Sequence, residues 1–185
     1  RPIVGDRPTM NNSGFWNYIN RNKKSILLNA RHPMGGDLLR QLIAASDVVV
    51  ENFSSGIMAS WGLDYPQLRE IRPDIIYCSV SGFGHTGRDS DNTTWGPTAQ
   101  ALSGVTAMSG LPGLPPAGFG YSYLDHTAGY YAANAIMMAL HHRNRTGEGQ
   151  HVDISQVEVG MALTGAAVLD HTVNGRGWLR PGVPP

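Results

Sequence analysis

The stretch that decides the fold runs from Asp47 to Gly84, DVVVENFSSGIMASWGLDYPQLREIRPDIIYCSVSGFG. It contains two short apolar runs, VVVEN and DIIYCSVSGFG, whose β-branched residues are typical of buried parallel strands. Between them, residues 65–71 are predicted to form a helix that Pro73 ends. A strand, a helix and a strand in this order predict a parallel βαβ unit, which is right-handed in nearly all known proteins.

The sequence before this unit predicts one further strand and one further helix. The apolar run from Ser25 to Leu28 has the length of a strand. The segment HPMGGDLLRQLIAASD follows, and its Pro33 suits the first turn of a helix. The large apolar residues of this segment recur at helical spacing: Leu38, Leu39, Leu42 and Ile43.

The sequence after this unit begins with a long loop-rich segment, residues 87–123, in which one small-residue helix is expected around 98–109. A loop of this length inside a compact domain is usually functional. A helix is then expected from Asp125 to about residue 142, and the run HVDI predicts one more strand. The capping-box pattern SQVE predicts the start of the last helix.

Parallel sheets bind ligands beyond the carboxyl ends of their strands. Three segments of this sequence are expected at that edge, one after each of the first three predicted strands. They are NAR at 29–31, ENFSSG at 51–56 and SGFGHTG at 81–87. The sequence therefore predicts that a ligand site lies where these segments meet.

The composition narrows the class of protein. With 14 basic and 14 acidic residues, the 185-residue chain has no net charge, which argues against nucleic-acid binding. A hydrophobic content of 41% is typical of a globular domain, and no apolar run approaches the roughly 18 residues of a membrane span. The single cysteine, Cys78, fits a reducing compartment, and the first residues show no targeting signal. A cytoplasmic protein without membrane or nucleic-acid partners is expected.

Asp125, in the context GYSYLDHTAG, is the foremost candidate for chemistry. Aspartate is a preferred N-cap residue, because its side chain accepts a free backbone N–H, so a structural role is the simpler interpretation. A helix N-terminus also favours negative charge, which keeps a carboxylate ionised and nucleophilic. Tyr121 and Tyr123 beside it suit contact with a ligand. The residues alone leave both roles open.

Other reactive side chains give weaker signals. His126 adjoins Asp125, but neighbouring side chains on a helix diverge by about 100°, so a structural histidine is favoured over a general base. Cys78 lies in an apolar strand, which favours a buried, unreactive thiol. Three further histidines lack the spacing of a zinc site, so no metal is expected: His141, His142 and His151.

Five blocks of the sequence together resemble one family, the class III CoA-transferases, also called the CaiB/BaiF family. The blocks are NRNKKSILLN, DVVVENFSSG, RPDIIYCSVSGFG, YLDHTAG and RTGEGQHVDISQVE, and their order and spacing match over about residues 15–174. WGPTAQALSG with GYSYLDHTAGYYAA looks most like the branch that acts on aromatic or dicarboxylic acids, such as succinyl-CoA:benzylsuccinate CoA-transferase.

The resemblance implies a fold and an assembly. The fold is α/β, a Rossmann-like doubly wound parallel sheet that forms part of the family's large domain. Residues 1–185 are then a fragment of that domain, without the family's first strand–helix unit and its C-terminal half. Family members form dimers whose chains interlink, and some pair two different subunits. An interlinked homodimer or a heteromer with a related subunit is therefore expected.

The resemblance also implies a site. Asp125 occupies the place of the family's nucleophilic aspartate, and the substrates are coenzyme A as acyl-CoA and a carboxylic acid, without a metal. Ser60 stands where many members carry an arginine that contacts the nucleotide, so that contact is either missing or supplied by Arg31 or Lys24. Three segments are implied to line the CoA cleft: Leu28, Asn29, Ala30 and Arg31; Asn52, Phe53 and Ser54; and Asn92, Thr93, Thr94 and Trp95.

The family's reaction moves CoA from an acyl-CoA donor to an organic acid through a CoA thioester on the aspartate. Three alternatives stay open: a non-catalytic subunit of a heteromeric CoA-transferase, an acyl-CoA racemase or hydratase-like relative, and a plain nucleotide-binding module. The racemase branch has a histidine about 30 residues before the aspartate. Here that region reads NTTWGPTAQ, without a histidine, which argues against racemisation.

Overall fold

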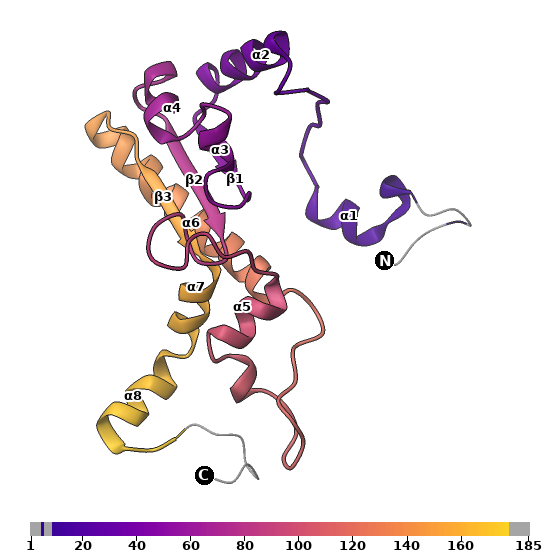
Figure 1. Ribbon diagram of the computed structural model, residues 1–185, viewed down its shortest axis with the longest axis vertical. Helices are drawn as coiled ribbons and strands as arrows, with labels where there is room; N and C mark the ends of the chain where they lie inside the picture. The colour runs from indigo at the N-terminus through magenta and orange to yellow at the C-terminus, as the bar shows by residue number, and fades with distance from the viewer. Residues whose placement is uncertain (1–4, 6–8, 178–185) are drawn as a thin grey trace. The chain divides into compact units, whose positions relative to one another are not determined.

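The structure, a computed structural model, describes residue 5 and residues 9–177 (Figure 1). The chain divides into two units, residues 1–36 and residues 37–185. The second unit contains a parallel sheet with helices before and after each strand. This arrangement confirms the predicted α/β class.

The first unit contains two short helical elements, the 3-10 turn η1 (Met10–Asn12) and the helix α1 (Gly14–Ile19). Ser13 caps α1, because its hydroxyl oxygen accepts a hydrogen bond from the backbone N–H of Trp16 at 3.3 Å. This satisfies one of the donors that the first turn of a helix leaves without an intrahelical partner.

The prediction of a strand from Ser25 to Leu28 is wrong. These residues form coil, and the Leu27 side chain is fully exposed. A strand is stable only where a neighbouring strand exchanges backbone hydrogen bonds with it. Within the described residues, no strand pairs with this segment. Its apolar composition alone therefore does not make it a strand.

Three parallel strands form the sheet of the second unit, in the order β1 (Val48–Glu51), β2 (Ile76–Ser81) and β3 (His151–Ser155) (Figure 1). Val48 is in register with Ile76, and Tyr77 with His151. All three strands fall where the sequence predicted them. Their carboxyl ends meet at one edge of the sheet.

Helices connect and follow the strands. The helix predicted over 65–71 is confirmed, but the single helix expected around 98–109 is divided, because Gly104, with φ of +86°, interrupts it. The helices are α2 (Pro33–Ala44), α3 (Ile57–Ser60), α4 (Tyr65–Ile71), α5 (Gly96–Leu102), α6 (Tyr123–Thr146), α7 (Gln156–Leu163) and α8 (Gly165–Asn174), with the 3-10 turn η2 (Thr106–Met108) after α5.

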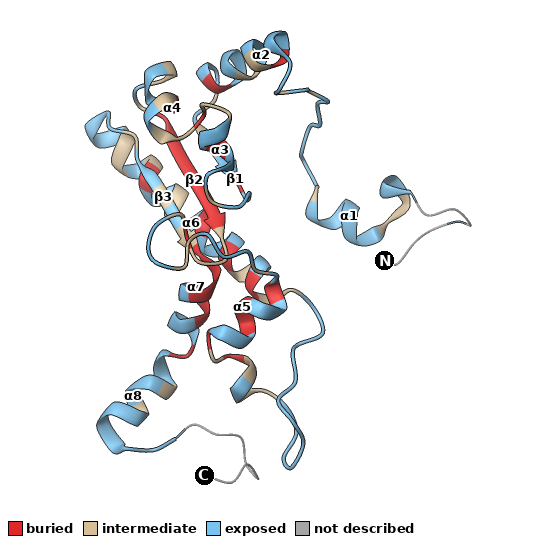
Figure 2. Ribbon diagram, viewed as in Figure 1, coloured by how far each residue is buried: buried red, intermediate tan, exposed pale blue. Residues whose placement is uncertain are grey.

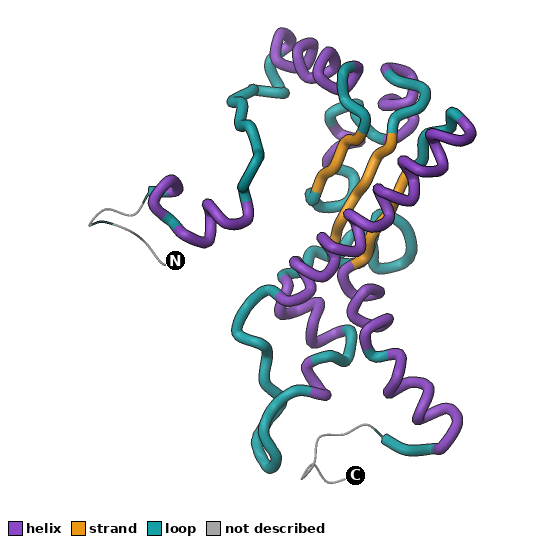
Figure 3. The backbone as a smooth tube through the Cα atoms, turned by 180° about the vertical axis from the view of Figure 1, so that it is seen from behind, coloured by secondary structure: helices purple, strands orange, loops and turns teal. Residues whose placement is uncertain are grey.

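The central strand β2 is buried on both faces (Figure 2), because alternate side chains of a strand point in opposite directions. On one face, Cys78 and Val80 pack against Ala128 and Ala132 of α6, which crosses the sheet in Figure 3. On the other face, Tyr77 packs with residues of α2 to α4 and their loops: Ile43, Met58, Leu63, Leu68 and Ile75. Helices on both faces confirm the doubly wound parallel sheet.

The two connections between the strands have opposite hands. The connection from β1 to β2 contains α4, and the connection from β2 to β3 contains α6, on the opposite face. Both connections step in the same direction across the sheet. The right-handed rule therefore holds for only one of them. The rule describes a strand that leads directly into its crossover helix, whereas residues 82–122 separate β2 from α6.

Charged side chains join the amino ends of the strands. Asp47, just before β1, accepts hydrogen bonds from Arg72 at 2.8 Å and from Arg143, in the last turns of α6, at 3.0 Å. Arg72 also pairs with Asp74 at 3.0 Å, and this hydrogen bond holds the pKa of the Asp74 carboxyl below its usual value. The cluster ties α6 to the starts of β1 and β2.

Candidate active site

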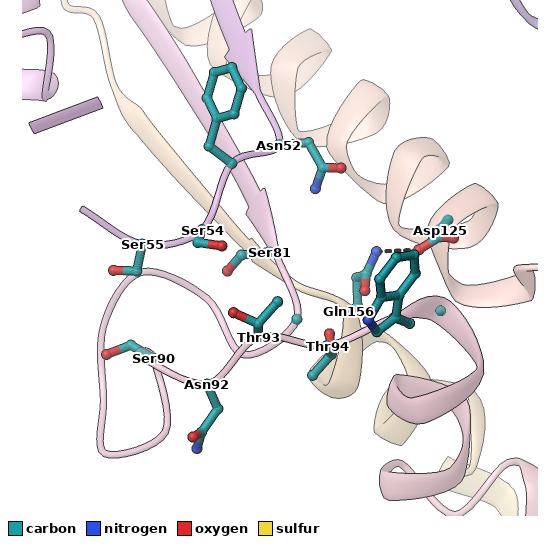
Figure 4. Close-up of a pocket in the computed structure, with 14 residues that line it drawn as sticks. Asn52, Ser54, Ser55, Ser81, Ser90, Asn92, Thr93, Thr94, Asp125 and Gln156 are labelled. Atoms are coloured by element: carbon teal, nitrogen blue, oxygen red, sulfur yellow. Dashed lines mark hydrogen bonds between the residues drawn. The ribbon is translucent and has the colours of Figure 1, made fainter. Parts of the chain in front are cut away.

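A polar cleft of about 280 Å³ lies at the carboxyl ends of the strands (Figure 4). The loops after β1 and β2, the segment before α5, and the first turns of α5, α6 and α7 form its walls. This is the edge at which the sequence predicted a ligand site. The lining residues are Asn52, Phe53, Ser54, Ser55, Ser81, Gly82, Ser90, Asn92, Thr93, Thr94, Trp95, Gly96, Asp125 and Gln156.

Asp125 lies in the first turn of α6, and its carboxylate lines the cleft. The helix begins at Tyr123 and Ser122 occupies the N-cap position, so the interpretation of Asp125 as the N-cap is wrong. Its oxygen Oδ1 instead accepts a hydrogen bond from Nε2 of Gln156 at 2.7 Å, the dashed line in Figure 4. The helix N-terminus still favours the negative charge of this carboxylate.

Two residues fit closely around the Asp125 carboxylate. Gln156, the first residue of α7, follows β3 directly and has an exposed fraction of 6%. Gly96 is the first residue of α5, and a Cβ at this position would lie 2.7 Å from Asp125 Oδ2 and 3.0 Å from Ser122 Cβ. Only glycine leaves room for the carboxylate here. The starts of α5 and α7 thus set the position of Asp125.

The loop after β1 is fixed by side-chain and backbone hydrogen bonds. The Asn52 side-chain amide donates to the backbone oxygen of Val80 on β2 at 2.6 Å. The backbone N–H of Phe53 donates to Oε2 of the buried Glu51 at 2.6 Å, and the Tyr77 hydroxyl donates to Oε1 at 3.0 Å. Burial, followed by the charge of Glu51, raises the pKa of Tyr77, so its hydroxyl keeps the proton that it donates.

The segment 90–95 lines the opposite wall of the cleft. Thr94 packs directly on Gly82, where any Cβ would overlap the threonine side chain. The hydroxyl oxygens of Thr94 and Ser81 are buried and have no hydrogen-bond partner among the described residues. Trp95, in contrast, is 79% exposed. The cleft therefore offers a ligand an open aromatic ring, whereas these two hydroxyl oxygens are packed away from its open space.

Polar side chains connect β2 and β3 to the loop that follows β2. Both carboxylate oxygens of Asp153 accept hydrogen bonds from the backbone N–H of His85, at 3.0 and 2.9 Å. The Ser79 hydroxyl lies 2.9 Å from Nε2 of His151 and donates to Asp153 at 3.3 Å. Burial lowers the pKa of His151, against the opposing effect of Asp153. These contacts hold the loop that follows β2 at the edge of the cleft.

The cysteine lies in the central strand β2. Cys78 is buried, and burial raises the pKa of its thiol to about 11, which agrees with the unreactive thiol that was predicted. The part of the chain that the structure describes holds no group of three or more His, Cys, Asp or Glu residues arranged for a metal ion. Each helix described is too short or too polar to cross a lipid bilayer.

The structure brings most of the predicted site residues together. Asp125, the segment 52–54 and the segment 92–95 all line the one cleft. Leu28, Asn29, Ala30 and Arg31 lie in the first unit, so their expected role stays a prediction. Sequence analysis missed Gln156, although its place directly after a predicted strand puts it at the ligand-binding edge.

Comparisons with known proteins agree on one family. The model of CoA-transferase family III matches residues 2–182. Succinate–glutarate CoA-transferase of Agrobacterium fabrum is 36% identical over 170 residues, 92% of this chain and 42% of that protein. The succinyl-CoA–L-malate CoA-transferase beta subunit of Chloroflexus aurantiacus is 37% identical over 144 residues, 77% of this chain and 36% of its own length.

A solved structure shares the fold. The CaiB/BaiF family protein from Brucella suis superposes with a TM-score of 0.82 at 35% identity, over 85% of this chain and 42% of that one. The chain thus spans about two fifths of the length of these proteins.

Proposed function

Because the chain belongs to CoA-transferase family III, we propose that it carries the nucleophile of an enzyme that moves CoA from an acyl-CoA donor to a carboxylic acid. This membership confirms the resemblance drawn from the five sequence blocks. The proposed nucleophile is Asp125. The observation that carries the proposal is the position of its carboxylate, at the start of a helix and on the wall of a polar cleft.

The proposed chemistry uses Asp125 covalently. Its carboxylate attacks the donor thioester, and the C–S bond breaks to give a mixed anhydride and CoA thiolate. The thiolate attacks the Asp125 carbonyl carbon, which releases the donor acid and leaves CoA on Asp125 as a thioester. The acceptor acid attacks this thioester to form a second anhydride, and the thiolate then takes the acceptor acyl group. A carboxylate suits this sequence because its attack on the thioester gives an anhydride that is reactive enough for the released thiolate to attack.

The rest of the cleft supports this role. Asn52, Phe53 and Ser54 on one side, and the segment 92–95 on the other, are proposed to hold the CoA moiety near Asp125. Trp95 exposes an aromatic ring that suits stacking or apolar contact.

The proposed acids are small dicarboxylic acids. The two relatives are named for the succinate–glutarate pair and for the transfer from succinyl-CoA to L-malate. Each of these is a dicarboxylic acid, which agrees with the branch that the sequence resembles. Turnover of the full-length protein with succinyl-CoA and a panel of acceptor acids tests this proposal, and a preference for monocarboxylic acceptors would contradict it.

Chemical trapping tests the covalent mechanism. The full-length protein is incubated with succinyl-CoA and then with hydroxylamine, which cleaves activated carboxyl groups. Peptide mass spectrometry is expected to find a hydroxamate at Asp125. Protein without acyl-CoA is the control and is expected to remain unmodified. A hydroxamate at another carboxylate, or at none when every subunit that co-purifies with the protein is present, would overturn the assignment of Asp125 as the nucleophile.

The similarity to the C. aurantiacus beta subunit favours a second arrangement, in which this chain pairs with a related subunit. If activity then requires both chains, trapping with the isolated chain gives no hydroxamate, whereas the reconstituted pair modifies Asp125. Co-purification with a second family member identifies that case.

A further inference from the structure

The two oxygens of the Asp125 carboxylate have different surroundings. Oδ1 lies 2.7 Å from Nε2 of the buried Gln156, whereas Oδ2 lies next to Gly96, in the room that the missing Cβ leaves for it. An ionised carboxylate only accepts hydrogen bonds, so the glutamine must turn its N–H group, and not its oxygen, toward Oδ1. The amide orientation is therefore set by the charge of Asp125.

We propose that Oδ2 is the attacking atom and that Gln156 is a catalytic hydrogen-bond donor to Oδ1. Gln156 then stabilises the oxyanion that forms each time the carbonyl carbon of Asp125, Cγ, is attacked. The inference rests on the proposed function and adds to it a residue and an order of bond-making.

The bonds follow from this assignment. Oδ2 attacks the donor carbonyl, the C–S bond breaks, and CoA leaves as thiolate with the electron pair. The thiolate then attacks Cγ, and the electrons of the Cγ–Oδ1 double bond move to Oδ1. When they return, the Cγ–Oδ2 bond breaks and the donor acid leaves with Oδ2. The acceptor carboxylate attacks Cγ in the same way, Oδ1 again holds the charge, and the Cγ–S bond breaks to release the thiolate.

The hydrogen bond from Gln156 affects these steps differently. In the free carboxylate Oδ1 carries about half a negative charge, and it becomes a nearly neutral carbonyl oxygen as Oδ2 attacks the donor. In each later attack on Cγ, Oδ1 changes from a neutral carbonyl oxygen to an oxyanion. A donor accelerates a step only if its bond is stronger in the transition state than before it. Gln156 therefore accelerates attack on Cγ and does not accelerate the first step.

The variant Gln156→Met tests this, because methionine keeps the length of the side chain and removes the donor. Full-length wild-type and variant proteins are first incubated with succinyl-CoA until the CoA thioester on Asp125 reaches a constant level by intact mass. A dicarboxylic acceptor is then added and the decay of the thioester is followed by rapid quench. We expect about 100-fold slower decay in the variant, the usual effect of removing one oxyanion donor.

The first step is measured separately, as the initial release of CoA from succinyl-CoA in hydroxylamine without an acceptor acid. It is expected to be unchanged or faster in Gln156→Met, which also shows that the variant folds; Gln156→Leu is the second variant if it does not. Gln100→Met is the matched control, since Gln100 is a buried glutamine outside the cleft lining, and it is expected to retain wild-type rates.

Each outcome distinguishes the two proposals. If the wild-type protein, together with any related subunit that co-purifies with it, forms no thioester on Asp125, the proposed function fails. If the thioester forms and decays equally fast in both proteins, Gln156 is not a donor to the oxyanion. Equal slowing of both steps would also overturn the inference, because it would mean that Gln156 only positions Asp125.

Discussion

The polar side chains at the two edges of the sheet differ in whether neighbouring side chains pair with them. At the amino edge, Asp47, Arg72, Asp74 and Arg143 are paired with one another at 2.8 to 3.7 Å. At the carboxyl edge, the Ser81 and Thr94 hydroxyls have no partner among the described residues, and Asp125 is bound on one oxygen by Gln156. The first edge joins helices and strands, and the second presents polar atoms to a cleft.

This difference indicates that the polar residues at the amino edge contribute mainly to stability, and those at the carboxyl edge mainly to the proposed reaction. Polar groups satisfied by neighbours stabilise the fold, whereas buried polar atoms without partners cost free energy. We therefore expect substitutions at the amino edge to change mainly the free energy of unfolding. Matched substitutions at the carboxyl edge should change mainly the reaction rate.

The largest expected effect comes from the same change made at both edges, Asp125→Asn and Asp47→Asn. Asparagine at 125 keeps the shape but is not a nucleophile, so turnover should fall at least about 1,000-fold without loss of stability. Asp47→Asn should keep turnover and lower the free energy of unfolding by about 1 kcal/mol, because Asp47 pairs with Arg72 and Arg143 near the surface. Steady-state rates and urea denaturation measure the two effects. Normal turnover in Asp125→Asn would remove the functional distinction between the edges.

An intermediate effect is expected from adding one methyl group at two helical glycines. In Gly96→Ala the new Cβ would lie 2.7 Å from Asp125 Oδ2, so the carboxylate must shift, and turnover should fall about 100-fold. Gly129→Ala, within α6, is the control, since its Cβ would meet no atom within 4 Å. That variant should keep its activity and gain about 0.5–1 kcal/mol of stability. Equal activity in the two variants would show that the contact at Gly96 does not position Asp125.

The smallest expected effect concerns the polar side chains between the two edges. Burial lowers the pKa of His151 below its value in the unfolded chain, about 6.5. As pH falls below about 6.5, the unfolded chain binds a proton that the folded chain does not, so the free energy of unfolding decreases until the folded pKa is passed. His151→Gln should make urea denaturation less dependent on pH between 6.5 and 5. An unchanged slope in His151→Gln would contradict the assignment.

Much of the fold was predictable from local pattern. The predicted segments coincide with the strands at 48–51, 76–81 and 151–155 and with the helix at 65–71. Runs of β-branched residues and apolar residues at helical spacing both reflect which side chains are buried. The run at 25–28 has the same character but is coil, since strand pairing depends on a neighbour that composition does not show. The division between α5 and η2 depended on the backbone conformation of one residue, Gly104.

The candidate site was predictable in part. Asp125, Asn52 and Trp95 lie on one cleft because the carboxyl ends of parallel strands must share an edge. The cap interpretation of Asp125 is wrong because the helix starts two residues earlier, a boundary shift that sequence patterns do not resolve. The placement of Leu28 to Arg31 is not tested, and their contact with CoA stays a prediction.

The sequence by itself determined the class of fold, the positions of the three paired strands, the edge at which the cleft lies and the family. Only the tertiary structure decided that Gln156 binds Asp125 and that Gly96 must lack a side chain. The physical reason is the range of the interactions. Propensity and periodicity act between residues a few positions apart, whereas the bond between Asp125 and Gln156 joins residues 31 positions apart and exists only once α6 and α7 have packed together.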